Sequence, residues 1–125
     1  MINDVLKQYK VVFTTPLDYA LYNKIETVNE WLSQFIDDHY TKSMASRLAT
    51  NVAAVLHENP LTPLIFFTQS MQCATITSSS TKIYELMDEY LDDNNITPAF
   101  VLPTADFKII VESWSDYVQN SPKGL

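Results

Sequence analysis

The chain has 125 residues, and 46% of them are hydrophobic, which excludes intrinsic disorder and fits one globular domain. Its formal net charge of −7 argues against a protein that binds the phosphate backbone of nucleic acids, because such binding needs clustered Lys and Arg. We expect a single globular domain over residues 1–120 and a short tail over residues 121–125.

Glycine is nearly absent from the chain, since Gly124 is its one example. Tight β-hairpins favour Asn-Gly, Asp-Gly or Gly-Gly turns, which supply positive φ angles, and none of these dipeptides occurs here. Thr-Pro pairs recur instead, and each places a capping hydroxyl before a residue that suits the first helical turn: Thr15-Pro16, Thr62-Pro63 and Thr97-Pro98. The sequence therefore predicts a mostly α fold, a compact bundle of five or six helices.

The first half of the chain has apolar residues at helical spacing. We expect a short helix over residues 3–13 and a long one over residues 16–39, where Thr15 and Asp18 resemble a capping box. A third helix is expected over residues 43–58, with alanines that allow a neighbour to approach closely. The apolar stripe of the long helix has i, i+3 and i+4 spacing and consists of Leu17, Leu21, Ile25, Val28, Leu32, Phe35 and Ile36.

Residues 63–78 are compatible with two structures. The apolar run 64–67 fits either a strand or a buried helical turn, and the β-branched stretch 73–77 fits a strand. The Thr62-Pro63 start favours a helix, as does the spacing of Leu64, Phe67, Met71 and Ala74. The alternative to the helical bundle is an α+β fold with a small hairpin at residues 64–77.

The last third of the chain again has helical spacing. A helix is expected over residues 81–93, and its apolar face consists of Ile83, Leu86, Met87 and Tyr90. Residues 96–103 are expected to be an extended or irregular connection, because each proline there restricts the residue before it. The last helix is expected over residues 105–119, capped by Thr104.

Negative charge is concentrated in this last third. Residues 1–82 carry seven acids and six bases, whereas residues 83–122 carry eight acids and one base. On a helix over residues 81–93 four acids would share one face, at a spacing where like charges repel each other. Such a face suits a basic partner, or it only keeps a small protein soluble. The four acids are Glu85, Asp88, Glu89 and Asp92.

The last helix offers a second indication of a binding surface. Ile109 is expected on its polar side, beside Glu112 and Asp116, where it could anchor a partner, although a single exposed isoleucine is common. The predicted partner-binding set is therefore Glu85, Asp88, Glu89, Asp92, Asp93, Ile109, Glu112 and Asp116.

The sequence shows no arrangement typical of catalysis or metal binding. His39 and His57 lack the spacing of metal ligands, and Cys73 lies among apolar residues where a buried, inert thiol is expected. The lack of glycine excludes a Gly-rich phosphate-binding loop. We therefore expect a protein that is not an enzyme, with no catalytic residue, no metal and no cofactor.

The single cysteine also rules out an internal disulfide and favours a reducing compartment. No apolar stretch reaches the ~20 residues of a membrane span, and the start of the chain has no signal-peptide core. We expect a soluble cytoplasmic protein without a membrane partner, in the host cytoplasm if the protein is viral.

These observations predict a small acidic protein that binds a basic surface of another protein and does not bind nucleic acid directly. One concrete form is an inhibitor that mimics nucleic acid and covers the basic channel of a nuclease or defence effector, as viral antidefence proteins do. The alternatives are a cytosolic chaperone or assembly factor, and a small-molecule-sequestering protein or enzyme with an interhelical pocket. The oligomeric state is left open, a homodimer included.

Overall fold

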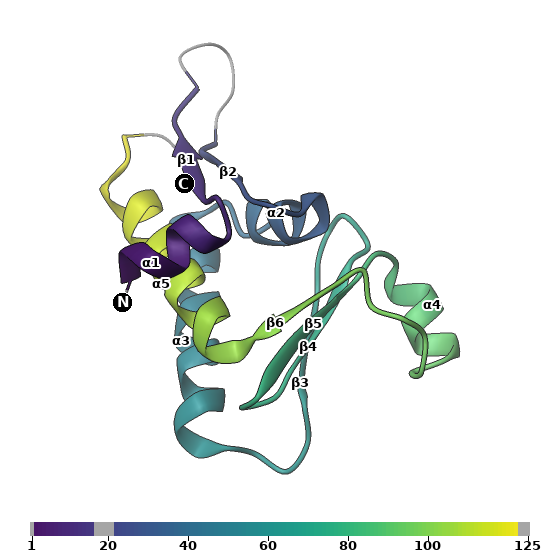
Figure 1. Ribbon diagram of the computed structural model, residues 1–125. Helices are drawn as coiled ribbons and strands as arrows, with labels where there is room; N and C mark the ends of the chain where they lie inside the picture. The colour runs from purple at the N-terminus through teal and green to yellow at the C-terminus, as the bar shows by residue number, and fades with distance from the viewer. Residues whose placement is uncertain (1, 17–21, 123–125) are drawn as a thin grey trace.

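The computed structural model of the chain describes residues 2–16 and 22–122, and it shows an α+β fold (Figure 1). It is 47% helical and 20% strand, with two antiparallel sheets of two and four strands. The prediction of a mostly α bundle is therefore wrong. In chain order the elements are α1 (Ile2–Gln8), β1 (Val12–Thr14), β2 (Lys24–Glu26), α2 (Glu30–Asp37), α3 (Lys42–Glu58), β3 (Leu64–Phe67), β4 (Cys73–Ile76), β5 (Ser80–Tyr84), α4 (Met87–Asp92), β6 (Phe100–Pro103) and α5 (Thr104–Asn120).

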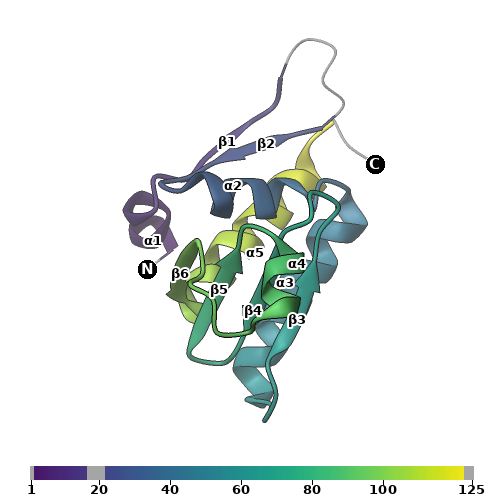
Figure 2. The ribbon, with the colours of Figure 1, turned by 90° about the vertical axis from the view of Figure 1, so that its right-hand side faces the viewer.

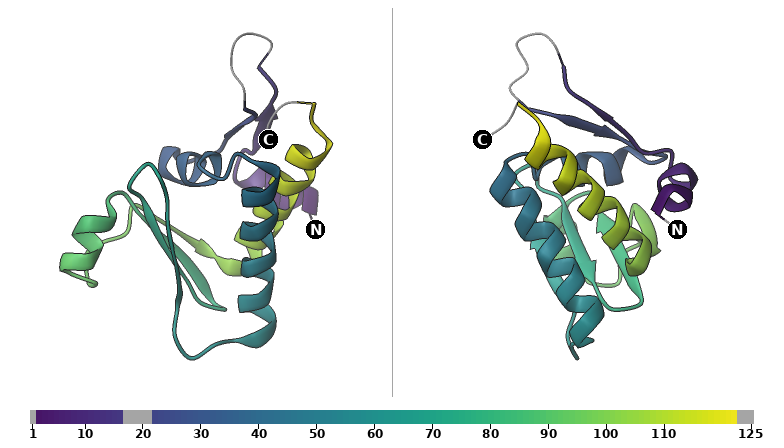
Figure 3. Two further views of the ribbon diagram at one scale, coloured as in Figure 1. Left: turned by 180° about the vertical axis from the view of Figure 1, so that it is seen from behind. Right: turned by 90° about the vertical axis from the view of Figure 1, so that its left-hand side faces the viewer.

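The larger sheet is a meander in which each strand pairs antiparallel with the next, in the order β3-β4-β5-β6. Helices α3 and α5 pack against each other and lie together on one side of this sheet, whereas α4 lies on the other side (Figures 2 and 3). We call the side facing α3 and α5 the inner face. Its side chains join the main core and are Leu64, Phe66, Ala74, Ile76, Thr81, Ile83, Phe100 and Leu102.

The long helix predicted over residues 16–39 is not present. Its first part, including Leu17, Asp18 and Leu21, lies in residues 17–21, which are outside the described part of the chain. Farther along, Ile25 is the buried residue of β2, which pairs with β1. Helix α2 begins only after Asn29, whose side chain accepts hydrogen bonds from the backbone N–H groups of Trp31 and Leu32.

The helices predicted over residues 63–78 and 81–93 are also wrong. The hairpin that stood as the alternative is present as β3 and β4, and β5 occupies the first part of the second range. Hydroxyl groups take the place of glycine in the turns: Thr68 Oγ1 accepts the N–H of Gln72, and Thr77 Oγ1 accepts the N–H of Ser80. Met71 supplies the positive φ, at 68°, so the scarcity of glycine did not prevent tight turns.

Two of the predicted long helices are confirmed, although the one with the longest apolar stripe, over residues 16–39, is not. The expected helices over residues 43–58 and 105–119 are α3 and α5, and the short N-terminal helix is α1, which ends earlier than predicted. Thr104 does not cap α5, because Pro103 occupies the N-cap position. The Thr104 hydroxyl instead donates a hydrogen bond to the carbonyl oxygen of Thr77, which ties the start of α5 to the β4–β5 turn.

Candidate interaction surface

The side of the four-stranded sheet opposite α3 and α5, which we call the outer face, is only partly covered and exposes apolar residues on both of its edge strands. Strand alternation and register place Ile65, Thr75, Lys82 and Val101 side by side across it. Ile65 is 41% exposed and Val101 48%. The exposed Lys82 lies between them on β5, so the outer face combines apolar edge strands with the polar centre that is common on an uncovered sheet face.

Helix α4 covers one end of the outer face. Tyr90 packs on Tyr84 of β5, with ring centroids 4.6 Å apart, and both rings are buried together with Cys73. The N–H of Met87 donates to the carbonyl oxygen of Met71 at 2.7 Å, which fixes the start of α4 beside the β3–β4 turn. Phe67 lies at this same end of the sheet, opposite Cys73. Its side chain is still 50% exposed, so α4 does not cover the edge strand completely.

The five acids predicted between residues 85 and 93 all lie in the segment that contains α4, although not on the long helix that was expected. We call residues 85–93 the acidic segment. Each of its carboxylates is on an exposed residue, and within the described ranges none of them forms a salt bridge. The acidic segment therefore places Glu85, Asp88, Glu89, Asp92 and Asp93 in solvent next to the apolar outer face.

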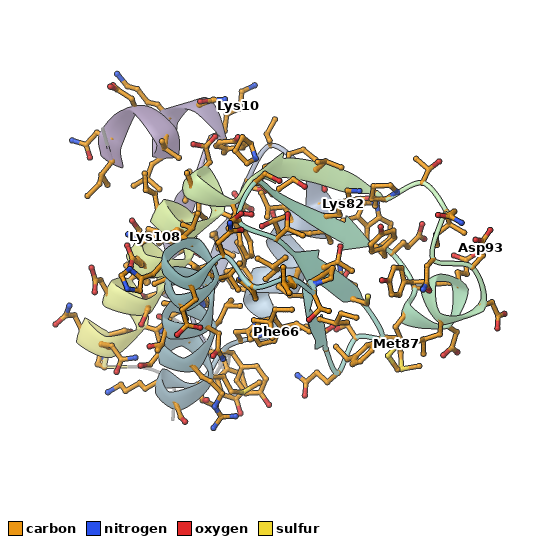
Figure 4. The ribbon with its side chains drawn as sticks, turned by 90° about the horizontal axis from the view of Figure 1, so that it is seen from below. Lys10, Phe66, Lys82, Met87, Asp93 and Lys108 are labelled. Atoms are coloured by element: carbon orange, nitrogen blue, oxygen red, sulfur yellow. The ribbon has the colours of Figure 1, made fainter. Side chains whose placement is uncertain are left out.

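The three site residues predicted on α5 lie elsewhere. Figure 4 shows Lys108 of α5 and Asp93 of the acidic segment on opposite sides of the molecule, with the sheet between them. Ile109 is half-buried against the main core, so the expectation of an exposed anchor is wrong. Glu112 pairs with Lys108 at 3.2 Å, and Asp116 is exposed on the same helix. The predicted set does not form one continuous acidic surface.

A cavity of about 470 Å³ that the sequence did not indicate lies beside α2. Asp37 and Asp38 line it, and the Asp38 Oδ1 atom accepts a hydrogen bond from Ser70 Oγ in the β3–β4 turn at 2.7 Å. Burial raises the pKa of Asp37 to about 6, although the N–H of Ile25 donates to its Oδ1. These contacts join α2 to β2 and to the sheet, which is a structural role.

Cys73 and His39, two side chains that can act in catalysis elsewhere, are both buried in this fold. Cys73 is fully buried, and burial raises the pKa of its thiol to about 11, which opposes formation of the nucleophilic thiolate. His39 is buried, and its Nδ1 atom is 2.8 Å from the carbonyl oxygen of Phe35; this burial lowers the pKa of the ring. In residues 2–16 and 22–122 no three His, Cys, Asp or Glu side chains converge as a metal site would need.

None of the helices in the described part of the chain combines the length and the hydropathy of a membrane span. Comparison of the chain with known family models, curated proteins and solved structures finds no match. The feature that stands out is the outer face together with the acidic segment.

Proposed function

We propose that this is a non-enzymatic protein that binds another protein through its outer face and its acidic segment. The observation that carries the proposal is the position of five exposed carboxylates, none of them in a salt bridge within the described residues, beside a sheet face that leaves Ile65, Phe67 and Val101 exposed. The expected partner has an apolar patch bordered by Lys and Arg. The single, buried Cys73 supports the predicted cytoplasmic location.

The apolar residues would supply most of the binding free energy. Ile65, Phe67 and Val101 lose exposed area when a partner covers the outer face, at roughly 25 cal/mol for each Å² removed from water. Exposed large apolar residues beside charged ones, as these are beside Lys82 and the acidic segment, are a feature of interaction sites. The cytosolic chaperone or assembly factor, the first alternative from the sequence, would use the same apolar residues without needing the acids.

The acidic segment would select the partner by charge. Exposed charges at the rim of an interface act mainly on the association rate and on the choice of partner. The basic channel of a nuclease is one surface of this kind, so the inhibitor hypothesis now depends on the acidic segment alone. Glu112 and Asp116 are not part of this proposal, since α5 lies on the other side of the sheet.

The test uses two matched charge-reversal variants as baits for capture from a host lysate, with quantification of every retained protein. One bait carries Asp88→Lys and Glu89→Lys, and the control carries Glu112→Lys and Asp116→Lys on α5, so both changes shift the net charge equally. For a partner of the proposed site, the amount retained should fall at least tenfold on the first bait and stay unchanged on the control. The same partner, once purified, should bind the wild-type protein directly.

The measured affinity for that purified partner should fall as NaCl rises, because rim charges are screened. Val101→Asp should weaken it as well, since this substitution places a charge in the apolar part of the surface. A partner insensitive to salt and to the acids, yet sensitive to Val101→Asp, would favour the chaperone alternative. If no retained protein depends on either the acids or Val101, the proposed function is wrong.

A further inference from the structure

Strand β3 is an open edge of the sheet. The N–H of Thr68 donates to the carbonyl oxygen of Gln72 at 3.0 Å, which marks a hydrogen-bonded pair at the end of the hairpin. Hydrogen-bonded pairs alternate along an antiparallel ladder, so Leu64 and Phe66 bond to β4. The backbone N–H and C=O groups of Ile65 and Phe67 therefore point away from the sheet, and in the described part of the chain no group bonds to them.

The opposite edge is protected. Strand β6 ends at Pro103, which has no N–H to donate, so Val101 alone offers a complete outward pair of backbone groups. Tyr9, which follows α1, packs edge-on to Phe100 of this strand, with ring centroids 6.5 Å apart, and donates to Asp106 of α5. Natural sheets commonly guard an edge with proline or charge, and β3 has neither within it.

The charge pattern indicates what covers β3. Not one Asp, Glu, Lys or Arg occurs between Asn59 and Thr81, in a chain whose net charge is −7. Two copies of so acidic a chain repel each other across most of their surfaces. The uncharged segment that contains β3 is free of this repulsion. A basic partner would gain no attraction from a neutral edge. The same segment holds four of the exposed large apolar residues, namely Leu61, Ile65, Phe67 and Met71.

We propose that a second copy of this chain pairs with β3, edge to edge and antiparallel, around a two-fold axis at Phe66. Ile65 of each copy then lies opposite Phe67 of the other, and each such pair exchanges both backbone hydrogen bonds. The same register brings the fully exposed Leu61 of one copy to the end of the sheet that carries Met71 of the other.

This pairing closes on itself, because the two-fold axis uses both open edges and leaves only the protected β6 edges outside. The result is one continuous sheet through both copies. The copies meet in the plane of the sheet, so the acidic segments and most of each outer face stay open, while Ile65 and Phe67 become neighbours across the seam. The dimer therefore does not depend on the proposed function, and either proposal can fail without the other.

The test measures the mass of the full chain by light scattering and sedimentation between about 1 µM and 1 mM, where weak dimers dissociate. The wild type should approach twice the 14.3 kDa of one chain at the upper end. Ile65→Pro removes an outward N–H without touching the β4 ladder, and this variant should stay at the mass of one chain. Val101→Pro makes the same change at the β6 edge and should still double in mass.

A second variant and a second measurement keep the test decisive if a proline perturbs the fold. Phe67→Lys places a charge at the edge and should also prevent doubling, whereas Val101→Lys should not. In the wild type, hydrogen exchange at the Ile65 and Phe67 amides should slow at least tenfold as the concentration rises. A constant mass of one chain, or a doubling that survives both β3 variants, would overturn the proposal.

Discussion

Both faces of the four-stranded sheet carry β-branched apolar side chains, but these have different neighbours. On the inner face Ile83 is fully buried beneath α3 and α5, whereas on the outer face Ile65 and Val101 are about half exposed. The alternation of a strand decides which residues share a face, but the helices that pack on the sheet decide which face becomes the core. An apolar strand residue therefore indicates a core or a binding surface equally well.

The largest expected effect comes from the same substitution on the two faces. Ile83→Ala should lower the free energy of unfolding by about 2–5 kcal/mol, because it leaves a cavity in a closed core. Ile65→Ala should lower it by less than about 1 kcal/mol, since that side chain is already 41% exposed. Urea unfolding of both variants, at a concentration where the wild type is monomeric, measures the difference. Equal losses would show that the outer face is as well packed as the inner one.

A smaller effect is expected where α4 docks on the outer face. Tyr90→Ala removes the ring that packs on Tyr84 and should cost about 1–2 kcal/mol. Hydrogen exchange should then speed up at the amides of α4 while those of α3 and α5 keep their protection. Leu91→Ala, on the same helix but 60% exposed, is the control and should leave the exchange rates unchanged. Faster exchange throughout the molecule would mean that α4 is part of the main core.

The smallest effect concerns Asp37, whose pKa burial raises to about 6 from a usual value of 3.8. Between these values the folded chain holds a proton that the unfolded chain has released, so this group makes the fold less stable as pH rises from about 4 to about 6. Asp37→Asn keeps an acceptor for the N–H of Ile25 and loses this dependence.

The measurement is the difference in Tm between Asp37→Asn and the wild type across that pH range. The Tm of the variant should rise relative to that of the wild type as the pH increases to about 6. Above pH 6 the difference in Tm should stay constant. His39 has the opposite pH dependence, because burial lowers its pKa and its protonation opposes folding. This contribution is the same in both proteins and cancels in the Tm difference. A difference that does not vary between pH 4 and pH 7 would contradict the raised pKa of Asp37.

The elements that could be predicted are those whose pattern is local. Helices α3 and α5 were found because their apolar stripes run for several turns without interruption. The exposure of the acids in residues 85–93 was found too, since carboxylates stay in water whether the backbone is helical or extended. By contrast, the stripe drawn through Ile25 and Val28 combined residues of β2 and of the turn after it, and Val28 is half exposed.

Strand pairing and the coverage of faces depend on partners that are distant in the chain. Residues 64–67 are a strand because β4 provides a ladder for them, and residues 81–84 are a strand because β4 and β6 flank them. The packing of α5 on the inner face turned Ile109 toward the core and separated Glu112 from the acidic segment. Amino-acid order specifies helical periodicity and the sign of the charge, whereas the sheet and the surface it leaves open arise from contacts that form only when the whole chain has folded.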